Sequence, residues 1–494
     1  MKGLPLLTLI TFLPAAAGLL LAVWKTSRAI QVALVASLAV VVLAGAAWVE
    51  FDPASSEMQF KEDHEWVRLG VGSIHYAVGV DGISLAMVAL TAFLMPLAIA
   101  CSRQMSRGFM IALLFLESGM LGAFIALDLF LFYVFWEAML LPMYLIVGIW
   151  GGPQRIYAAV KFILYTIAGS VLMFAAILYC YAQAGTFDVE LLPGALERAR
   201  PALGVQQVLF LAFGLSFAIK VPLFPFHTWL PDAHVQAPTA GSVILAGVLL
   251  KLGAYGFLRV AIPFFPQAAR HYTPLLVALS VIGVVYGALM AMAQSDIKKL
   301  VAYSSVSHLG FVMLGIFSGS VAGAQGGVLQ MVNHGLSTGA LFLLVGIIYE
   351  RTHRRGVDDF GGMAKVTPVY AALFMVVTLS SIGLPGLNGF VGEFLVLFGS
   401  FRGHPWATGI AGLGVILGAV YMLRLYRDVF FGPVTMAERE KTADVTKGEL
   451  AYLVPVLALI VLLGVFPNSV LSKTERAVQG VVRKLNPEAP VARP

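Results

Sequence analysis

The chain has 494 residues, of which 59% are hydrophobic and only 12% are charged. Soluble domains carry about 25% charged residues, so this composition excludes a soluble globular protein and predicts a polytopic membrane protein. The net charge of +6 does not indicate nucleic-acid binding, because the basic excess of membrane proteins usually lies in cytoplasmic loops. We therefore expect a lipid bilayer, and no nucleic acid, around this chain.

The cysteines and glycine patterns exclude several kinds of cofactor site. Cys101 and Cys180 are the two cysteines, and they fall far apart, in or beside apolar runs. Zinc and iron–sulfur clusters need several closely spaced ligands, and no nucleotide-binding glycine motif is present. We expect no metal and no cofactor in this chain, so any redox chemistry must belong to another chain.

Apolar runs of membrane-spanning length occur along the whole chain. About 20 apolar residues cross a bilayer as a helix. Fourteen such runs begin near residues 4, 30, 84, 109, 129, 156, 206, 239, 274, 299, 326, 367, 408 and 450. The first run ends near Val23 and is followed by Lys25 and Arg28 without a clear cleavage site, which predicts a retained span rather than a signal peptide.

Loop charges predict the orientation of these spans. The loop from Glu50 to Gly79 is mainly acidic, whereas basic residues gather in the alternate set of loops. These basic residues are Lys25, Arg28, Arg103, Arg107, Arg155, Lys298, Lys299, Arg351, Arg354, Arg355, Lys365, Arg439, Lys441 and Lys447. The positive-inside rule then places both termini on the outer side, which agrees with an even number of spans.

No linker long enough to separate soluble domains is present, so we predict one membrane domain in three parts. Residues 1–83 form two helices and an external loop, residues 84–431 form the core, and residues 432–494 form the last helix and a short tail.

Several predicted spans carry an ionisable residue near their middle. These residues are Glu117, Glu137, Lys220, Lys251, His308, His334 and Glu393. A charge at the bilayer centre costs about 2.5–3.5 kcal/mol even on the mild insertion scale, so such groups are paired or hydrated and commonly functional. A packing role remains an equal alternative for Glu117 and for either histidine alone.

Two spans are interrupted beside such a group. Pro222 and Pro225 follow Lys220, and Pro385 lies in the Gly-rich run before Glu393. Proline breaks a helix, and broken helices at membrane depth are tolerated around internal cavities. The breaks fall in the seventh and twelfth spans, which predicts two inverted five-helix repeats, about residues 109–261 and 274–430.

The segment after the first break contains His227, Asp232 and His234. These residues resemble part of a metal set, but a fourth ligand is lacking and the segment is rich in proline. A capping and gating turn is the favoured interpretation.

Four segments carry a resemblance to a known family. They are 133–145 (YVFWEAMLLPMYL), 220–234 (KVPLFPFHTWLPDAH), 249–256 (LLKLGAYG) and 296–310 (DIKKLVAYSSVSHLG). Over roughly residues 80–470 the chain resembles the antiporter-like membrane subunits of respiratory complex I, the proton-pumping NADH:quinone oxidoreductase. Glu393 on the twelfth helix resembles the M-type members, because L-type and N-type members typically have lysine there.

The resemblance implies an all-α fold of about fourteen transmembrane helices, with helices 7 and 12 broken. It implies that Glu137 and Lys220 form a coupled pair, that Lys251, His308 and His334 continue a proton relay, and that Glu393 is its terminal exchange group. Glu117, His227, Asp232 and His234 are further candidates without an assigned role.

The resemblance also implies the setting of the chain. It would be a non-redox subunit of a proton-translocating enzyme in the bacterial inner membrane, beside L-like and N-like subunits and a peripheral redox arm. FMN, iron–sulfur clusters and quinone would belong to other subunits. The alternatives are a subunit of an Mrp-type cation/proton antiporter, a subunit of a membrane-bound hydrogenase, and a purely structural spacer. The spacer is disfavoured because it gains nothing from ionisable groups at membrane depth.

Overall fold

Long apolar helices make up most of this protein. The computed structural model describes residues 4–69, 72–199, 201–434 and 443–488. Among these residues, 13 helical segments are long and apolar enough to cross a membrane. The span predicted near residue 367 instead comprises two shorter apolar helices, α18 (Pro368–Ser381) and α19 (Asn388–Phe401). The prediction of an all-α polytopic protein is confirmed, while the repeats and the broken seventh and twelfth helices stay predictions.

The chain divides into two units of contacting residues. The first contains residues 1–221, 248–274 and 472–494, and the second contains residues 222–247 and 275–471. The three-part division predicted at residues 83 and 431 remains untested by this grouping.

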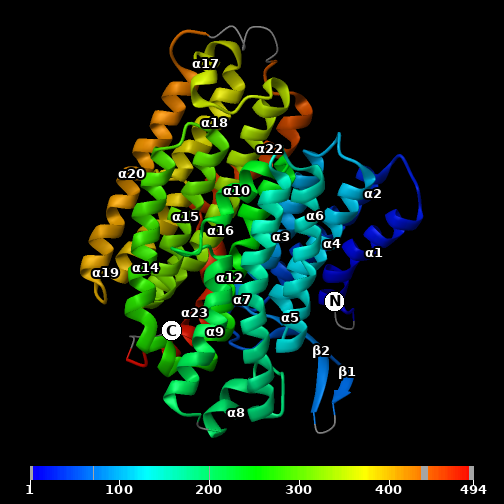
Figure 1. The fold of residues 1–494 in the computed structure, drawn as a ribbon, viewed down its shortest axis with the longest axis vertical. Helices are drawn as coiled ribbons and strands as arrows, with labels where there is room; N and C mark the ends of the chain where they lie inside the picture. Colours follow the sequence, from blue (N-terminus) through cyan, green and yellow to red (C-terminus); the bar gives the residue numbers. More distant parts are fainter. Residues whose placement is uncertain (1–3, 70–71, 200, 435–442, 489–494) are drawn as a thin grey trace. The chain divides into compact units, whose positions relative to one another are not determined.

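The first unit carries the N-terminal spans, which are labelled in Figure 1. Its helices are α1 (Leu6–Val23), α2 (Ala29–Glu50), α3 (Gly82–Ala100), α4 (Arg107–Ile125), α5 (Leu129–Ala138), α6 (Leu140–Trp150), α7 (Arg155–Ala184), α8 (Leu192–Ala199), α9 (Leu203–Lys220), α12 (Lys251–Gly256), α13 (Ile262–Phe264) and nearly all of α23 (Asn468–Leu485). Two π-helical turns flank α12: η1 (Leu245–Leu249), which begins in the second unit, and η2 (Phe257–Ala261).

The second unit carries most of the remaining helices. They are α10 (Trp229–Gln236), α11 (Thr239–Ile244), α15 (Ile297–Ile316), α16 (Val321–Thr352), η3 (Val357–Asp359), α17 (Met363–Val366), α18, α19, α20 (Pro405–Phe430) and α22 (Lys447–Val465). Helix α14 (Pro266–Met292) begins in the first unit and continues in the second.

Polar side chains fix where several apolar helices begin. Asp81 accepts a hydrogen bond from the Ser84 backbone at the start of α3, and Asp296 accepts one from the Lys299 backbone at the start of α15. Such caps satisfy backbone N–H groups that have no partner within the helix. These two apolar runs therefore start as helices at defined residues.

A β-hairpin lies in the acidic segment that was predicted as an external loop. Strands β1 (Gln59–Leu69) and β2 (Gly72–Val80) pair antiparallel. Glu62 accepts a hydrogen bond from the Leu7 backbone at 2.8 Å, and Lys61 forms a 2.7 Å ion pair with Glu190. These contacts attach the hairpin to α1 and to the segment before α8.

Helix α23 occupies the segment that was predicted as a short tail. Its apolar face, including Val478 and Val482, is buried, whereas Arg483 and Lys484 are exposed. An amphipathic helix of this kind lies along a surface with its apolar side covered.

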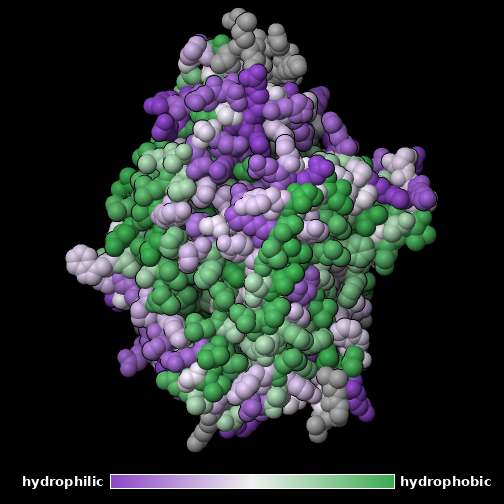
Figure 2. All heavy atoms as spheres, viewed as in Figure 1, coloured by the Kyte–Doolittle hydropathy of each residue, from purple (hydrophilic) through white to green (hydrophobic). Residues whose placement is uncertain are grey.

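Hydrophobic side chains are also exposed on the outside of the protein, as Figure 2 shows for one face. Val35 and Val171 in the first unit, and Phe398 and Ile416 in the second, are more than half exposed. Surfaces of this composition are compatible with lipid and not with water.

Candidate functional site

Lys220 is the last residue of α9, and its side chain is buried, with 1% exposed. Pro222 lies two residues further on, where it cannot continue the helix. The Lys220 Nζ atom lies 5.3 Å from the centre of the Trp136 ring and 5.6 Å from that of Phe162. No hydrogen-bond acceptor contacts Nζ among the described residues, and the faces of these two rings attract a cation at such distances.

Glu137 lies on the last turn of α5, directly after Trp136. The carboxylate acts on Lys220 electrostatically, and one of its oxygens is buried without a hydrogen bond among the described residues. None of the ion pairs in the described part of the chain joins Glu137 to Lys220. The structure therefore brings the predicted pair into one unit without direct contact.

Lys251 is fully buried on α12, between the two π-helical turns. Gly253 and Gly256 bring this helix against α9, because a Cβ atom at either position would lie 2.5 Å from Phe217 atoms. The glycines thus allow close packing between the helix of Lys251 and the helix of Lys220. Single π-helical turns occur frequently at functional sites.

Glu117 is fully buried on α4, and its Oε1 atom accepts a 3.0 Å hydrogen bond from Ser37 of α2. This hydrogen bond joins α4 to one of the two N-terminal helices. It is compatible both with a packing role for Glu117 and with a functional one.

The second unit contains a hydrogen-bonded site around Glu393 of α19. Its Oε1 atom lies 3.0 Å from His308 Nδ1 on α15 and accepts a 3.2 Å hydrogen bond from Gln330 of α16. The rings of His308 and His334 are centred 5.7 Å apart. The structure thus brings together three of the predicted residues, which come from three helices.

A chain of amides and hydroxyls continues from this site. Asn333 donates a 2.7 Å hydrogen bond to the Asn388 backbone, and Ser380 donates one of 2.5 Å to the Asn388 side chain. Ser337 lies 2.7 Å from Ser380. Residues of this chain and of the Glu393 site line a cavity of about 10 Å³, which is close to the smallest space that holds one water molecule.

Gly383 shapes the turn between α18 and α19. Its φ of +74° is a conformation that residues with a Cβ atom rarely adopt. A Cβ atom here would also lie 3.2 Å from Glu393 Oε2. Glycine therefore permits both the turn and the position of the carboxylate.

The residues after the first predicted break pack among aromatic rings. The His234 ring stacks on Phe342 with centroids 4.6 Å apart, and the His227 ring lies 5.1 Å from that of Tyr286. Asp232 lies in the first turn of α10. The described residues contain no group of three or more His, Cys, Asp or Glu side chains placed to hold a metal ion.

A second, largely buried network that was not predicted from the sequence is centred on Arg259 of η2. Arg259 forms a 2.6 Å ion pair with Asp81 and donates hydrogen bonds to Ser84 and Tyr255. Tyr255 in turn donates to the Phe124 backbone at 2.8 Å. A basic residue two turns after Lys251 in an apolar run was the available signal, but its distant partner Asp81 has no local signature.

A many-spanning helical fold with two sets of buried ionisable side chains is typical of membrane transport proteins. The comparisons with known proteins agree. A family described as "NADH:quinone oxidoreductase/Mrp antiporter, TM" matches residues 126–418, and the chain belongs to this family.

Individual relatives specify the similarity further. The chain is 49% identical over 484 residues to a Rhodobacter capsulatus protein named "NADH-quinone oxidoreductase subunit M", covering 94% of each chain. It superposes with a TM-score of 0.89 and 33% identity on a chain of the respiratory complex I of Thermus thermophilus, covering 97% of this chain and 100% of that one. A chain of the Mrp complex of Dietzia sp. DQ12-45-1b, at 22% identity and a TM-score of 0.85, covers 99% of this chain and 98% of its own, and shares the fold. The chain is therefore a multi-pass membrane protein of a respiratory-complex family.

Proposed function

We propose that this chain is the M-type, proton-translocating membrane subunit of a bacterial NADH:quinone oxidoreductase, and that it holds no redox group of its own. The observation that carries the proposal is the presence of two buried ionisable sites, at Lys220 and at Glu393, in a chain 49% identical to a protein named subunit M.

At the first site, Lys220 is the proton carrier and Glu137 controls it. A unit charge at ~6 Å contributes roughly 3 kcal/mol at an effective dielectric constant of ~20. Moving the Glu137 carboxylate toward or away from Lys220 would change the free energy of a proton on Nζ by that amount. This compares with ~2.3 kcal/mol for one charge crossing 100 mV, so the movement is sufficient to load or release one proton.

At the second site, the Glu393 carboxylate exchanges a proton with His308, with which it is already in hydrogen-bond contact. Gln330 donates a second hydrogen bond to the same carboxylate oxygen and so helps to hold Glu393 in place. Proton transfer needs donor and acceptor within hydrogen-bond reach, and this geometry meets that requirement.

Lys251, together with His334, is proposed to connect the two sites. Quinone reduction in other subunits would supply the driving force through electrostatic coupling along the membrane domain. The proposed setting is the bacterial inner membrane with both termini outside, between L-like and N-like subunits, with FMN and iron–sulfur clusters in a peripheral arm.

A subunit of an Mrp-type cation/proton antiporter is the second candidate, supported by the shared fold of the Dietzia chain. The higher identity to proteins named subunit M favours the oxidoreductase. Isolation of the tagged chain from its native membrane distinguishes them, since quinone oxidoreductase subunits co-purify in one case and antiporter subunits in the other.

The test of proton translocation uses the assembled complex in proteoliposomes. Lys220→Ala and Glu393→Ala are each expected to abolish NADH-driven proton pumping, measured with a pH-sensitive dye. Lys25→Ala, which removes an exposed lysine, is the matched control and should pump normally. Full pumping by either buried-site variant would refute the assignment.

A further inference from the structure

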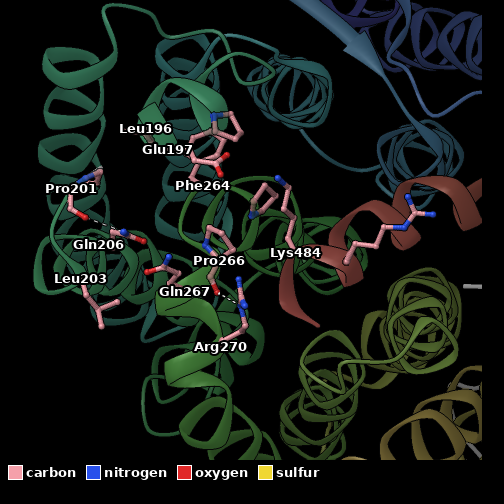
Figure 3. Close-up of a pocket in the computed structure, with 13 residues that line it drawn as sticks. Leu196, Glu197, Pro201, Leu203, Gln206, Phe264, Pro266, Gln267, Arg270 and Lys484 are labelled. Carbon is pink, nitrogen blue, oxygen red and sulfur yellow. Dashed lines mark hydrogen bonds between the residues drawn. The ribbon is translucent and has the colours of Figure 1, made fainter. Parts of the chain in front are cut away.

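A cavity lies where α8, α9, α14 and α23 meet, lined by residues of the first unit and placed at the opposite end of α9 from Lys220. Its volume is about 560 Å³. Figure 3 shows residues of all four helices around it, with Glu197, Gln206, Arg270 and Lys484 among those labelled. Nothing in the proposed proton pathway uses this cavity.

The lining carries an excess of positive charge. Arg270, Arg483 and Lys484 contribute cations and Glu197 contributes one carboxylate. Arg270 Nε donates to the Pro266 backbone at 3.2 Å, and none of the three cations forms an ion pair in the described part of the chain. Their remaining N–H groups are therefore available to an anion.

The walls are preformed. Pro193, Pro201, Pro263 and Pro266 all line the cavity, and proline fixes its own backbone angle. Gln206 is held by a 3.0 Å hydrogen bond to the Pro201 backbone. A ligand entering this cavity would have little backbone to order, which lowers the entropic cost of binding.

An apolar stripe leads away from the cavity along α9. Leu203 lines the cavity and is 48% exposed, and Val208 and Leu211 follow on the same helix with 66% and 44% exposed. A ligand with a charged head and an apolar tail would contact the cations and the stripe at once. Inorganic phosphate or an acidic protein segment would gain nothing from the stripe.

We propose that this cavity binds the phosphate headgroup of an anionic phospholipid, with Arg270, Arg483 and Lys484 around the phosphate and an acyl chain along Leu203, Val208 and Leu211. The amphipathic helix α23 supplies two of the three cations. Its basic face and covered apolar face are the features that place a helix at the headgroup level.

The experiment compares two triple variants of the full chain in its assembled complex. Arg270→Gln/Arg483→Gln/Lys484→Gln removes the cations of the cavity. Lys25→Gln/Arg28→Gln/Arg402→Gln removes the same charge from exposed positions outside it. Both complexes are extracted directly into polymer-bounded discs, and bound phospholipids are counted by native mass spectrometry after transfer to detergent.

We expect the wild type and the control variant to retain about one more anionic phospholipid per chain than the cavity variant. Titration with short-chain phosphatidylglycerol should show roughly 100-fold weaker binding for the cavity variant, because each cation near a lipid surface contributes about fivefold. Short-chain phosphatidylcholine should bind the two variants equally. Lys484→Gln alone should weaken binding about fivefold. Because Lys484 is exposed, this single variant should fold even if the triple variant does not.

Three outcomes would overturn the proposal. Equal retention of anionic lipid by the cavity and control variants would show that the cavity holds none. Displacement of phosphatidylglycerol by millimolar inorganic phosphate would show a site for the free anion. Loss of a neighbouring subunit from the cavity variant, with unchanged lipid binding, would show a protein contact.

Discussion

Lys220 and Glu393 are both buried ionisable groups, but they differ in the kind of side chain that surrounds them. Lys220 faces aromatic rings and has no hydrogen-bond acceptor among the described residues. Glu393 accepts hydrogen bonds and adjoins a chain of amides and hydroxyls. The first environment is sensitive to a moving charge, because few dipoles screen it. The second fixes its acid in place and offers a proton a partner at hydrogen-bond distance.

The largest expected effect is that of neutralising the acid of the hydrogen-bonded site. Glu393→Gln keeps the shape of the side chain but removes the group that exchanges a proton with His308. We expect proton pumping to fall by about 100-fold or more, the typical contribution of a positioned acid–base group. Pumping is measured in proteoliposomes, with Glu57→Gln on the exposed loop as the control. Wild-type pumping by Glu393→Gln would show that pumping needs no proton exchange at Glu393.

The next largest expected effect is on the stability of the protein, which should fall more when a polar group is removed near Glu393 than near Lys220. Asn388→Ala removes the partner of Ser380 and Ser337, and unsatisfied buried polar groups cost about 1–3 kcal/mol each. Ser216→Ala, one turn before Lys220, removes a hydroxyl that has no hydrogen bond among the described residues and should leave stability within about 0.5 kcal/mol. Thermal unfolding of both variants checks this, and similar losses would contradict it.

A smaller effect is expected from removing an aromatic ring beside Lys220. Trp136→Leu removes the nearest ring from Lys220, and a cation–π contact contributes about 1 kcal/mol. We expect the pumping rate to fall about fivefold. Trp406→Leu, at an exposed position, is the control, and an unchanged rate in Trp136→Leu would exclude the ring as a determinant.

The smallest expected change in stability is at an ion pair of the hairpin, which is exposed to solvent, unlike Lys220 and Glu393. Asp63 raises the pKa of His75 above 6.5 through a 2.6 Å contact. The pair therefore stabilises the fold fully below pH ~6.5, and this stabilisation is lost as pH rises through the folded-state pKa. Asp63→Asn should reduce stability by about 0.2–1 kcal/mol at pH 5.5 and by less at pH 8.5. An equal loss at both pH values would show that the contact does not depend on the His75 charge.

The sequence predicted the helices better than it predicted their contacts. Apolar runs mark nearly every span, because lipid requires both apolar side chains and a satisfied backbone. The hairpin escaped notice because β1 is mostly polar, and α23 did because its apolar residues are spaced along a short polar tail.

The site shows the same limit. Lys220, Glu137 and Glu393 stand out because their charge is costly in an apolar run. The hydrogen bonds that Gln330, Asn333 and Asn388 contribute could not be foreseen, since neutral polar residues on three helices give no signal of their shared position. The roles of all these residues stay predictions until they are tested in the assembled complex.

The Asp81 side chain connects the hairpin to the helical segment that carries Lys251. This residue directly follows β2, and its two carboxylate oxygens hold the start of α3 and Arg259, respectively. Arg259 lies eight residues beyond Lys251 in the same helical segment. The ion pair between Asp81 and Arg259 therefore joins the base of the hairpin directly to the helical segment that carries the buried Lys251.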